Sequence, residues 1–540
     1  MPKDWIALIG PEVEENLSLR YLAAALETGG IPCRIIAFNT WADITAVLEK
    51  ILKADPEPLM VGLSLSFQWR AKDFLALAVA LRERGYEGHI TAGGHFGTFA
   101  CTEILRDFPE IDSICLHEAE ETIVRLADSL RCGTPADTIS GLAHRDASGR
   151  MRPSGLPRPP DVSTLAWPDR RGTPASCLGH RIAPIISSRG CYAKCEFCCI
   201  AEWHEQTLPG KRYRLRPVTD VADEMAWLHH NRGIDVFIFH DDNFFLPTRT
   251  KSLDRIHALS TELGKRNVGR FATVVKARPD DIDEEVFTFM TARLGLTRLY
   301  LGVETDSKQG LMTLRRGVTS DQNHAALALL RRLGIYVCFN MLIFDPDSTV
   351  EDLETNLEFI DRHGECPLNF GRVELYAGTP LLRRMLASAR CSGDYLGWDY
   401  HLGDPVMQAV FEIAMRCFYD RNFAHGSIAN RLMGTRFDVE VCRYFHPGIY
   451  RDEWLEAAIC ASRTLARDSV AGLREIVRFA LTDASREERH IFEAGLRQRL
   501  RRANTRLQDV AAQLEAVVQR AVGARCLHTC PAPEPIAMSL

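Results

Sequence analysis

A tight group of cysteines is the clearest chemical signal in the chain. Cys191, Cys195 and Cys198 follow the spacing Cys-x3-Cys-x2-Cys, in a loop directly after an apolar, strand-like stretch. Thiolates are the usual protein ligands of iron–sulfur clusters, and closely spaced cysteines on one loop can wrap a single cluster. Three protein ligands leave one iron of a four-iron cluster open for cofactor or substrate chemistry. A structural zinc site is the alternative, although zinc usually takes a fourth Cys or His with its own short spacing.

Polar residues stand at the ends of the strand-like stretches that follow the cysteines. In a parallel sheet, ligands collect at the carboxyl ends of the strands, so we expect these side chains on the same side as the cysteine loop. The acids and the amide among them are acceptors that an amine ligand could use. These residues are Asp241, Asp242, Asn243, Lys276, Arg278 and Glu304.

A third group of residues lies ahead of the cysteines. Ser64 and Ser66 end one strand-like stretch, and Gly93, Gly94 and His95 end the next. Small side chains at strand ends allow the tail of a bulky ligand to approach the backbone. No Gly-x-Gly-x-x-Gly follows the first apolar stretch, which argues against a dinucleotide site.

Strand-like and helix-like stretches alternate in two parts of the chain. The first part has apolar strand-like runs at residues 5–9, 33–36, 59–64, 89–92 and 113–115. Alternation of this kind predicts a parallel, doubly wound sheet. From residue 182 onwards, six further strand–helix repeats, the last strand at residues 372–376, predict a barrel or partial barrel. The predicted fold class is therefore α/β.

The 540 residues are too many for one ordinary domain, and the patterns divide them into four units. Residues 1–145 form the doubly wound unit. Residues 146–180 are rich in proline and suit an extended linker. Residues 181–378 form the partial barrel. Residues 379–540 are mostly helical, and we expect them to complete a substrate pocket.

One helical stretch near the C-terminus has a regular apolar stripe with alternating spacings of four and three. The spacing is that of a heptad seam, over residues 496–517. Two interpretations remain: a long helix packed on its own chain, or a coiled coil that joins two copies. The stripe consists of Leu496, Leu500, Ala503, Leu507, Val510, Leu514 and Val517.

The overall composition excludes several classes of function. Hydrophobic residues make up 46% and charged residues 25%, which is ordinary for a globular protein. The net charge of −6 argues against a nucleic-acid surface, and no apolar run is long enough to cross a membrane. We therefore expect a cytoplasmic chain whose 17 cysteines are mostly thiols. Cys526 and Cys530, with His528 between them, are too few for an auxiliary cluster.

The cysteine loop, which places aromatic Phe197 before its last cysteine, resembles that of the radical S-adenosylmethionine (SAM) superfamily, over about residues 181–378. The resemblance implies that Cys191, Cys195 and Cys198 bind a [4Fe–4S] cluster. SAM would then chelate the fourth iron and be cleaved to a 5′-deoxyadenosyl radical, with Phe197 at its adenine. Further contacts to SAM are implied for the strand-end residues Asp241, Asp242, Asn243, Arg278 and Glu304. The first three replace the family's commoner Gly-Gly-Glu.

Residues 1–145 resemble the cobalamin-binding fold. The Ser64-Leu65-Ser66 and Gly93-Gly94 elements carry the likeness, and residues 117–121 match a Gly-Glu-x-Glu segment with His117 in place of Gly. The Asp-x-His-x-x-Gly motif is absent, so no histidine of that motif would bind cobalt. The implied cobalamin contacts are Ser64, Ser66, Gly93, Gly94, His95 and Glu118, with Trp69 covering cobalt from below.

The two resemblances together are those of the cobalamin-dependent radical SAM enzymes, class B methyltransferase-like. They imply transfer of a methyl group from SAM, via methylcobalamin, to an unactivated carbon or phosphinate phosphorus of a small-molecule biosynthetic intermediate. An external flavodoxin- or ferredoxin-type protein would supply electrons. The alternatives are a non-methylating cyclase or ring-rearranging enzyme, and a cobalamin or SAM sensor without turnover. Methylthiolation of RNA or protein would need further cluster cysteines, and Cys33, Cys101 and Cys115 are widely spaced.

Overall fold

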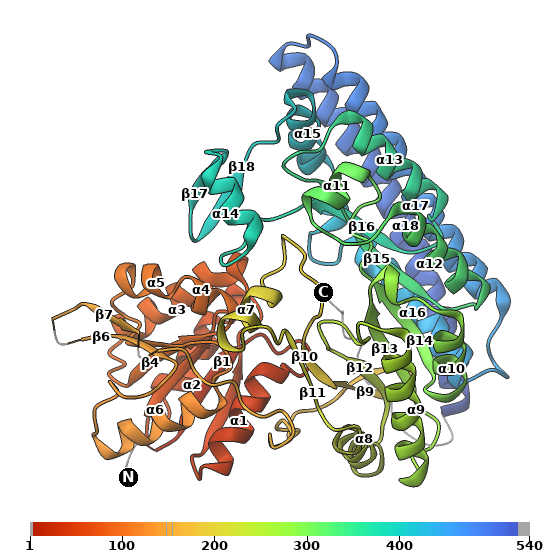
Figure 1. Ribbon diagram of the computed structural model, residues 1–540. Helices are drawn as coiled ribbons and strands as arrows, with labels where there is room; N and C mark the ends of the chain where they lie inside the picture. Colours follow the sequence, from red (N-terminus) through yellow and green to blue (C-terminus); the bar gives the residue numbers. More distant parts are fainter. Residues whose placement is uncertain (1–3, 147, 154, 527–540) are drawn as a thin grey trace.

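The computed structural model describes residues 4–146, 148–153 and 155–526, and it contains two seven-stranded sheets that lie side by side (Figure 1). The first sheet has the order β2-β1-β3-β4-β5-β6-β7. Its first five strands are parallel, apolar and largely buried, close to the predicted positions, because each is a short apolar run that ends at a turn. They are β1 (Ile6–Gly10), β2 (Cys33–Ala37), β3 (Met60–Ser64), β4 (His89–Gly93) and β5 (Ser113–Cys115).

Helices cover both faces of this first sheet, as a doubly wound fold requires. Helices α1 (Leu17–Thr28) and α6 (Glu120–Cys132) pack on one face. The side chain of Asn16 caps α1 by accepting hydrogen bonds from the backbone of Ser18 and Leu19. The other face carries α2 (Ile44–Leu52), α3 (Ala71–Glu83), α4 (His95–Phe99) and α5 (Cys101–Asp107).

The second sheet, of order β16-β15-β14-β13-β12-β9-β8, is curled but not closed, so the predicted partial barrel is confirmed. Its six parallel strands are β9 (His180–Ile185), β12 (Ile234–Phe239), β13 (Ala272–Ala277), β14 (Leu296–Leu301), β15 (Val337–Phe344) and β16 (Leu368–Arg372). The connecting helices are α8 (Val218–Arg232), α9 (Arg249–Lys265), α10 (Glu284–Arg293), α11 (Lys308–Thr313), α12 (Ser320–Arg332) and α13 (Val350–Arg362). The cysteine loop stands between β10 (Ser188–Gly190) and α7 (Ile200–Thr207), and β11 (Tyr213–Leu215) pairs with β10.

The sixth barrel strand lies earlier than predicted. The alternation of charged and apolar residues predicted a strand at residues 372–376, whereas β16 ends at Arg372. Its partner β15 ends at Phe344, which is the residue paired with Arg372. Residues 373–376 therefore have no neighbouring strand to extend the ladder, although Val373 still donates one hydrogen bond to the Phe344 carbonyl.

The proline-rich segment at residues 146–180 is not a free linker. It contains β7 (Met151–Pro153), which forms an antiparallel hairpin with β6 (Leu142–Arg145), and β8 (Ala175–Cys177), which pairs with β9. Between these strands, buried Arg170 bridges Glu15 of the first unit and Glu224 of α8. Proline excludes helix here, but ion pairs and edge strands fasten the segment to both sheets. The division into four units stays our proposal.

Five helices and a short hairpin make up the rest of the described chain. Residues of α16 pack into the barrel interior, where Met433, Phe437 and Val441 contact apolar side chains of the barrel strands. The long α17 and α18 lie along the outside (Figure 1). The elements are α14 (Pro380–Ala387), β17 (Cys391–Asp394), β18 (Gly397–Tyr400), α15 (Pro405–Asn422), α16 (Ile428–Phe445), α17 (Asp452–Ala480) and α18 (Arg486–Cys526).

The apolar stripe of α18 packs on its own chain. Leucines 496, 500, 507 and 514 are buried in clusters that α15, α16 and α17 share. Val510 and Val517 are 40% and 38% exposed, whereas Ala511 and Val518 are buried in their place. The buried stripe thus follows the period of a straight helix rather than a heptad. Of the two interpretations, the structure shows the long helix packed on its own chain, because helices of the same chain cover these leucines, and a homodimer stays a prediction.

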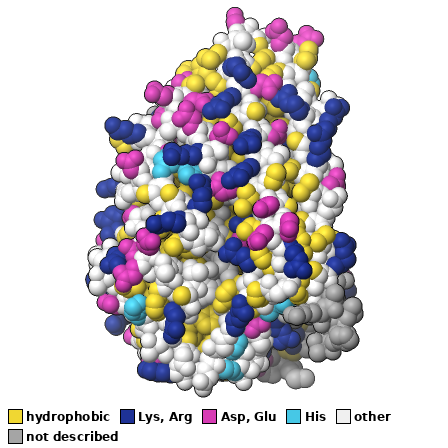
Figure 2. All heavy atoms as spheres, turned by 90° about the vertical axis from the view of Figure 1, so that its right-hand side faces the viewer, with side chains coloured by type: hydrophobic (Ala, Val, Ile, Leu, Met, Phe, Trp, Pro, Cys, Tyr) yellow, Lys and Arg dark blue, Asp and Glu magenta, His cyan; other side chains and the backbone are white. Residues whose placement is uncertain are grey.

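The face that includes these long helices carries interspersed basic and acidic side chains (Figure 2). No helix in the part of the chain that the structure describes is long and apolar enough to span a membrane. Residues 527–540, with His528 and Cys530, lie outside the described residues, so the absence of an auxiliary cluster there stays a prediction.

Candidate active site

The cysteine loop is held in place by backbone hydrogen bonds. Gly190, just before the first cysteine, has φ +93°. A side chain at this position would clash with the backbone carbonyl of Arg212, the residue before β11. Its N–H donates to Asp242 Oδ2 at 3.0 Å. Burial raises the pKa of the Cys191 thiol to about 11 and that of Cys198 well above its usual value. These thiols therefore need a metal or a cation beside them to ionise.

Two arginines supply positive charge beside the middle cysteine. Arg278 Nη1 lies 3.5 Å and Arg316 Nη1 3.0 Å from Cys195 Sγ. Arg278 comes from the end of β13, as predicted, and Arg316 comes from the loop after α11. Sequence reasoning missed Arg316, because it follows no strand. Paired guanidinium groups favour a thiolate, so the loop fits a thiolate-ligated cluster.

The three thiols do not form a site for one metal ion. Among the described residues, no three His, Cys, Asp or Glu side chains come close enough to hold a single ion. A four-iron cluster spreads its thiolates over several irons, so it does not require such close approach.

Of the three polar residues that end β12, only Asp242 is exposed. Asp241 is buried and accepts hydrogen bonds from Ser187 and Ser188, which fixes the chain ahead of the cysteine loop. Asn243 is also buried and donates to the Phe245 carbonyl and to Asp281. Asp242 is therefore the one of the three best placed to accept an N–H from a bound amine, and Asp241 and Asn243 position the loops.

Glu304 and Phe197 join the arginines around Cys195. Glu304 has φ +66°, a strained conformation for a residue other than glycine and one that is common at functional sites. Burial raises the pKa of its carboxyl, although the charges of Arg316 and Arg278 oppose this. The Arg316 guanidinium lies 5.9 Å from the Phe197 ring centroid. The predicted SAM contacts Phe197, Arg278 and Glu304 thus converge on the cysteine loop.

The first sheet shows the features that a large ligand needs at the carboxyl ends of its strands. Gly94 has φ +99°, and an added Cβ would lie 2.8 Å from Ser66 Oγ. Ser66 Oγ is 3.1 Å from Ser64 Oγ, and Gly93 lies at the end of the neighbouring strand β4. Nearby, Trp69 is 70% exposed. A large, solvent-exposed aromatic side chain favours contact with an apolar surface of a ligand. Together with the small residues at the strand ends, Trp69 therefore fits cobalamin.

An aromatic contact joins the two groups of site residues. Trp203 of α7, the helix that follows the cysteine loop, lies 4.3 Å from His95 and 4.7 Å from His117, measured between ring centroids. Neither ring nitrogen of buried His117 has a partner among the described residues. Burial lowers the pKa of His117 to about 4, so the His117 imidazole that contacts Trp203 is uncharged near pH 7. The sequence pattern did not predict a role for His117. Its φ of +55° is a conformation that favours glycine, which is the residue that the Gly-Glu-x-Glu segment has at this position.

Glu118, for which the sequence predicts a contact with cobalamin, takes part in ion pairs, and the contact stays a prediction. One of its carboxylate oxygens accepts from Arg189 at 2.5 Å and the other accepts from Arg214. Arg189 also donates to Glu120 at 2.6 Å. Because Arg189 stands two residues before Cys191, this buried ion-pair cluster ties the first sheet to the cysteine loop.

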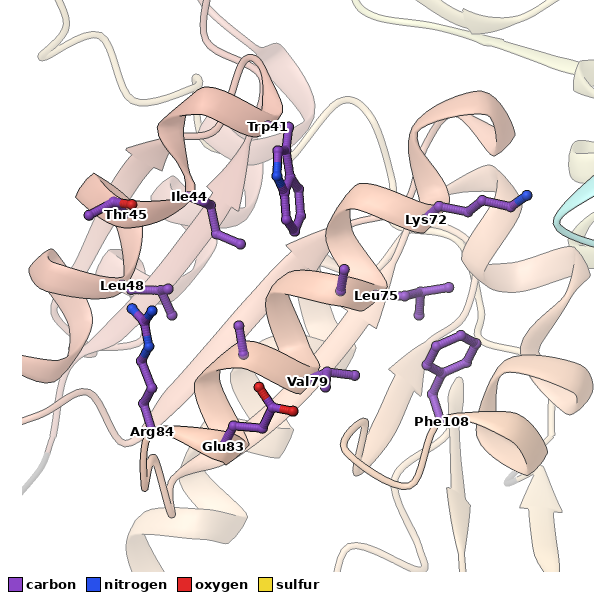
Figure 3. A pocket seen from close by; sticks show the side chains of 12 residues that line it. Trp41, Ile44, Thr45, Leu48, Lys72, Leu75, Val79, Glu83, Arg84 and Phe108 are labelled. Atoms are coloured by element: carbon purple, nitrogen blue, oxygen red, sulfur yellow. The ribbon is translucent and has the colours of Figure 1, made fainter.

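One pocket of the first unit lies away from these residues. A pocket of about 540 Å³ opens between α2 and α3 on the first unit, with Trp41, Leu75 and Phe108 among its lining residues (Figure 3). None of the predicted site residues lines it. This pocket therefore does not coincide with the residues whose types fit the cofactors, which lie at the junction of the two sheets.

Two family models match the chain. The radical SAM superfamily model matches residues 185–360, and the B12 binding domain model matches residues 10–127. An uncharacterised methyltransferase of Pyrococcus horikoshii is 26% identical over 376 residues, which are 68% of this chain and 77% of the relative. An anaerobic magnesium-protoporphyrin IX monomethyl ester cyclase of Synechocystis is 28% identical over 296 residues, 54% of this chain and 56% of the relative.

The fold is also similar to a solved structure. The cobalamin-dependent SAM radical enzyme OxsB with aqua-cobalamin bound is 18% identical, with a TM-score of 0.67 over 98% of this chain and 81% of that one. The cofactors are accordingly a [4Fe–4S] cluster, SAM and cobalamin. Family models, relatives and fold agree with the residues at the junction, and the chain combines a B12 binding domain with a radical SAM domain, the combination of the cobalamin-dependent radical SAM enzymes.

Proposed function

We propose that this enzyme moves the methyl group of SAM, by way of cobalamin, to an unactivated carbon or phosphinate phosphorus of a small-molecule biosynthetic intermediate. The observation that carries the proposal is the contact of Trp203 with His95 and His117. This contact joins the cysteine loop to the carboxyl edge of the first sheet. Residues suited to each cofactor therefore border one junction, where a substrate could meet both.

Each cofactor has a proposed set of residues. Cys191, Cys195 and Cys198 would hold the cluster. Phe197, Asp242, Arg278 and Glu304 would hold SAM. Ser64, Ser66, Trp69, Gly93, Gly94 and His95 would hold cobalamin. When bound, the cluster and SAM supply a carbon-centred radical, and cobalamin supplies a methyl carrier.

The chain's own residues orient these groups and exclude water. Arg278 and Arg316 stabilise the thiolate of Cys195, because a nearby cation favours the charged form. Asp242 accepts an N–H from the amine of SAM. Trp69 would pack against the bound corrin and would keep water and other ligands away from it. An external flavodoxin- or ferredoxin-type protein would deliver the electrons.

The test is the set of products that anaerobic, reduced holoenzyme forms from SAM and a candidate substrate. Methyl transfer predicts equal amounts of S-adenosylhomocysteine and 5′-deoxyadenosine, and a substrate heavier by one methylene. A substrate of unchanged mass, with methionine and 5′-deoxyadenosine as the products of SAM and no S-adenosylhomocysteine, would overturn the proposal.

The second candidate is a non-methylating cyclase or ring-rearranging enzyme. It is supported by the Synechocystis relative, whose name is that of a cyclase. This candidate predicts 5′-deoxyadenosine without S-adenosylhomocysteine in the same assay. A sensor without turnover predicts neither product.

A further inference from the structure

Two cations stand on adjacent strands inside the partial barrel. Lys276 of β13 pairs in register with Tyr300 of β14. Arg298 precedes Tyr300 by two residues, so all three side chains share the inner face of the sheet. Cys338 of β15 is the register partner of Tyr300 on the other side. None of the proposed cofactor contacts uses Lys276 or Arg298.

Among the residues that the structure describes, no carboxylate forms an ion pair with Arg298. The residue is 4% exposed, and its guanidinium lies 4.2 Å from the Tyr300 ring centroid and 5.4 Å from that of Phe437. Its Nε donates to Cys338 Sγ at 3.3 Å. Within the part of the chain that the structure describes, no carboxylate lies within 4.0 Å of it, and neither terminal nitrogen has an acceptor. A buried charge without an oppositely charged partner is costly, and arginine does not relieve the cost by losing its proton.

Lys276 lies nearer the carboxyl ends of the barrel strands, and no described residue forms an ion pair with it. It is half-buried, and the described residues place no carboxylate within 4.0 Å of its ammonium. The acid that its charge influences is Glu14, which is 47% exposed in the loop before α1 and lies 3.6 Å from His240. Burial, and then the charge of Lys276, lower the pKa of His240 to about 4, so His240 adds no charge near pH 7.

We infer that Lys276 and Arg298 bind an oxyanion of the substrate. The inference rests on the proposed function, and it narrows the substrate class to small molecules that carry a phosphate, phosphonate or carboxylate group. Guanidinium groups match the geometry of such oxyanions with paired hydrogen bonds. The aromatic walls strengthen this attraction, because they exclude water. Exposed Asn340, two residues beyond Cys338 on the same face, offers an amide donor.

The test measures binding of inorganic phosphate, methylphosphonate and acetate to the SAM-loaded holoenzyme by isothermal titration calorimetry. We expect one of these probes to bind, and Lys276→Met and Arg298→Met each to weaken it about tenfold or more, since each removes a charged donor. Arg298→Lys keeps the charge and should weaken binding less. Lys251→Met, which removes an exposed lysine of α9, is the matched control and should leave the affinity unchanged. The preferred probe shows whether the substrate carries a phosphoryl or a carboxylate group.

Several results would overturn the inference. One is that none of the three anions binds, and another is that binding survives both Met variants. A third is an equal loss of SAM affinity in both variants, which would assign the two cations to the carboxylate of SAM. Iron and cobalt contents identify variants that fail to fold, and Lys276→Met carries the test if Arg298→Met does fail. Anion binding without S-adenosylhomocysteine formation would refute the proposed methyl transfer alone.

Discussion

At the residue scale, one short loop assigns different roles to neighbouring cysteines. Cys195 is buried beside Arg278 and Arg316, whereas the adjacent residues Cys198 and Cys199 are only partly buried. The spacing assigns Cys198 to the cluster, because Cys199 falls outside the Cys-x3-Cys-x2-Cys pattern. The arginines were not visible in that pattern.

The first prediction separates these cysteines. Cys195→Ser removes a soft thiolate ligand, so anaerobically reconstituted protein should lose most of its roughly four irons per chain. Cys199→Ser is the matched control and should keep its iron. Iron analysis with the visible absorption spectrum provides the measurement. Loss of iron in the control, or full iron content in Cys195→Ser, would contradict the assignment.

A second prediction concerns Arg316, which donates to Cys195 Sγ at 3.0 Å. Arg316→Met removes a positive hydrogen-bond donor from a cluster ligand, so the cluster should become harder to reduce, by roughly tens of millivolts. A redox titration followed by electron paramagnetic resonance measures the shift. Its neighbour Arg315 is 67% exposed, and Arg315→Met should leave the potential unchanged. Equal potentials in both variants would show that Arg316 does not act on the cluster.

At the scale of elements, buried ion pairs join segments that lie far apart in the sequence. Arg189 of β10 pairs with Glu118 and Glu120, at the start of α6. Its guanidinium also lies 4.9 Å from the Tyr21 ring centroid of α1. The strand that leads into the cysteine loop is thus fixed to the first sheet, so the spacing between the two sites is set by side chains and not by the linker alone.

The third prediction breaks this connection. Arg189→Met leaves the buried carboxylate of Glu120 without its arginine and leaves Glu118 with Arg214 alone, which should cost about 3–5 kcal/mol of stability. The thermal unfolding midpoint should fall, and the reconstituted protein should hold less iron because the loop is loosened. Arg125→Met, which breaks an exposed pair with Glu121 on α6, should change little. Equal midpoints for the two variants would contradict the positioning role of Arg189.

At the scale of the whole molecule, buried neutral histidines link stability to pH. His363 is 3% exposed, and its Nε2 lies 2.9 Å from Nδ1 of His324. Burial, and then the charges of His324 and Arg331, lower the pKa of His363 to about 3. An unfolded chain binds a proton near pH 6.5, so between these values the unfolded state holds the proton that the folded state excludes.

The fourth prediction follows from this sign. The stabilisation due to neutral His363 is complete above about pH 6.5 and is lost as the pH falls towards 3, by at most about 1.4 kcal/mol per pH unit. His363→Gln should therefore flatten the fall of the unfolding midpoint between pH 7.5 and pH 5. Exposed His401→Gln serves as the control and should keep the wild-type slope. A slope unchanged by His363→Gln would refute the prediction.

Much of the architecture is predictable from local pattern, because buried parallel strands are short apolar runs that end at turns. Both sheets appear close to the predicted residues for this reason. The site is less predictable, because several of its side chains are brought together by contacts between residues that are far apart in the sequence. Arg316 and Cys195 are 121 residues apart, and α16 enters the barrel from far beyond its last strand. Strand β16 was misplaced because the length of its partner, and not its own pattern, decides where the ladder ends.

The fate of the methyl group of SAM tests the central claim most directly. Anaerobic holoenzyme is reduced and incubated with trideuteromethyl-labelled SAM, and the extracted corrinoid is weighed by mass spectrometry. Our account predicts that the trideuteromethyl group is recovered on cobalamin and that S-adenosylhomocysteine appears with it. An unlabelled corrinoid, in a preparation that still cleaves SAM to 5′-deoxyadenosine, would contradict the account and favour a cyclase.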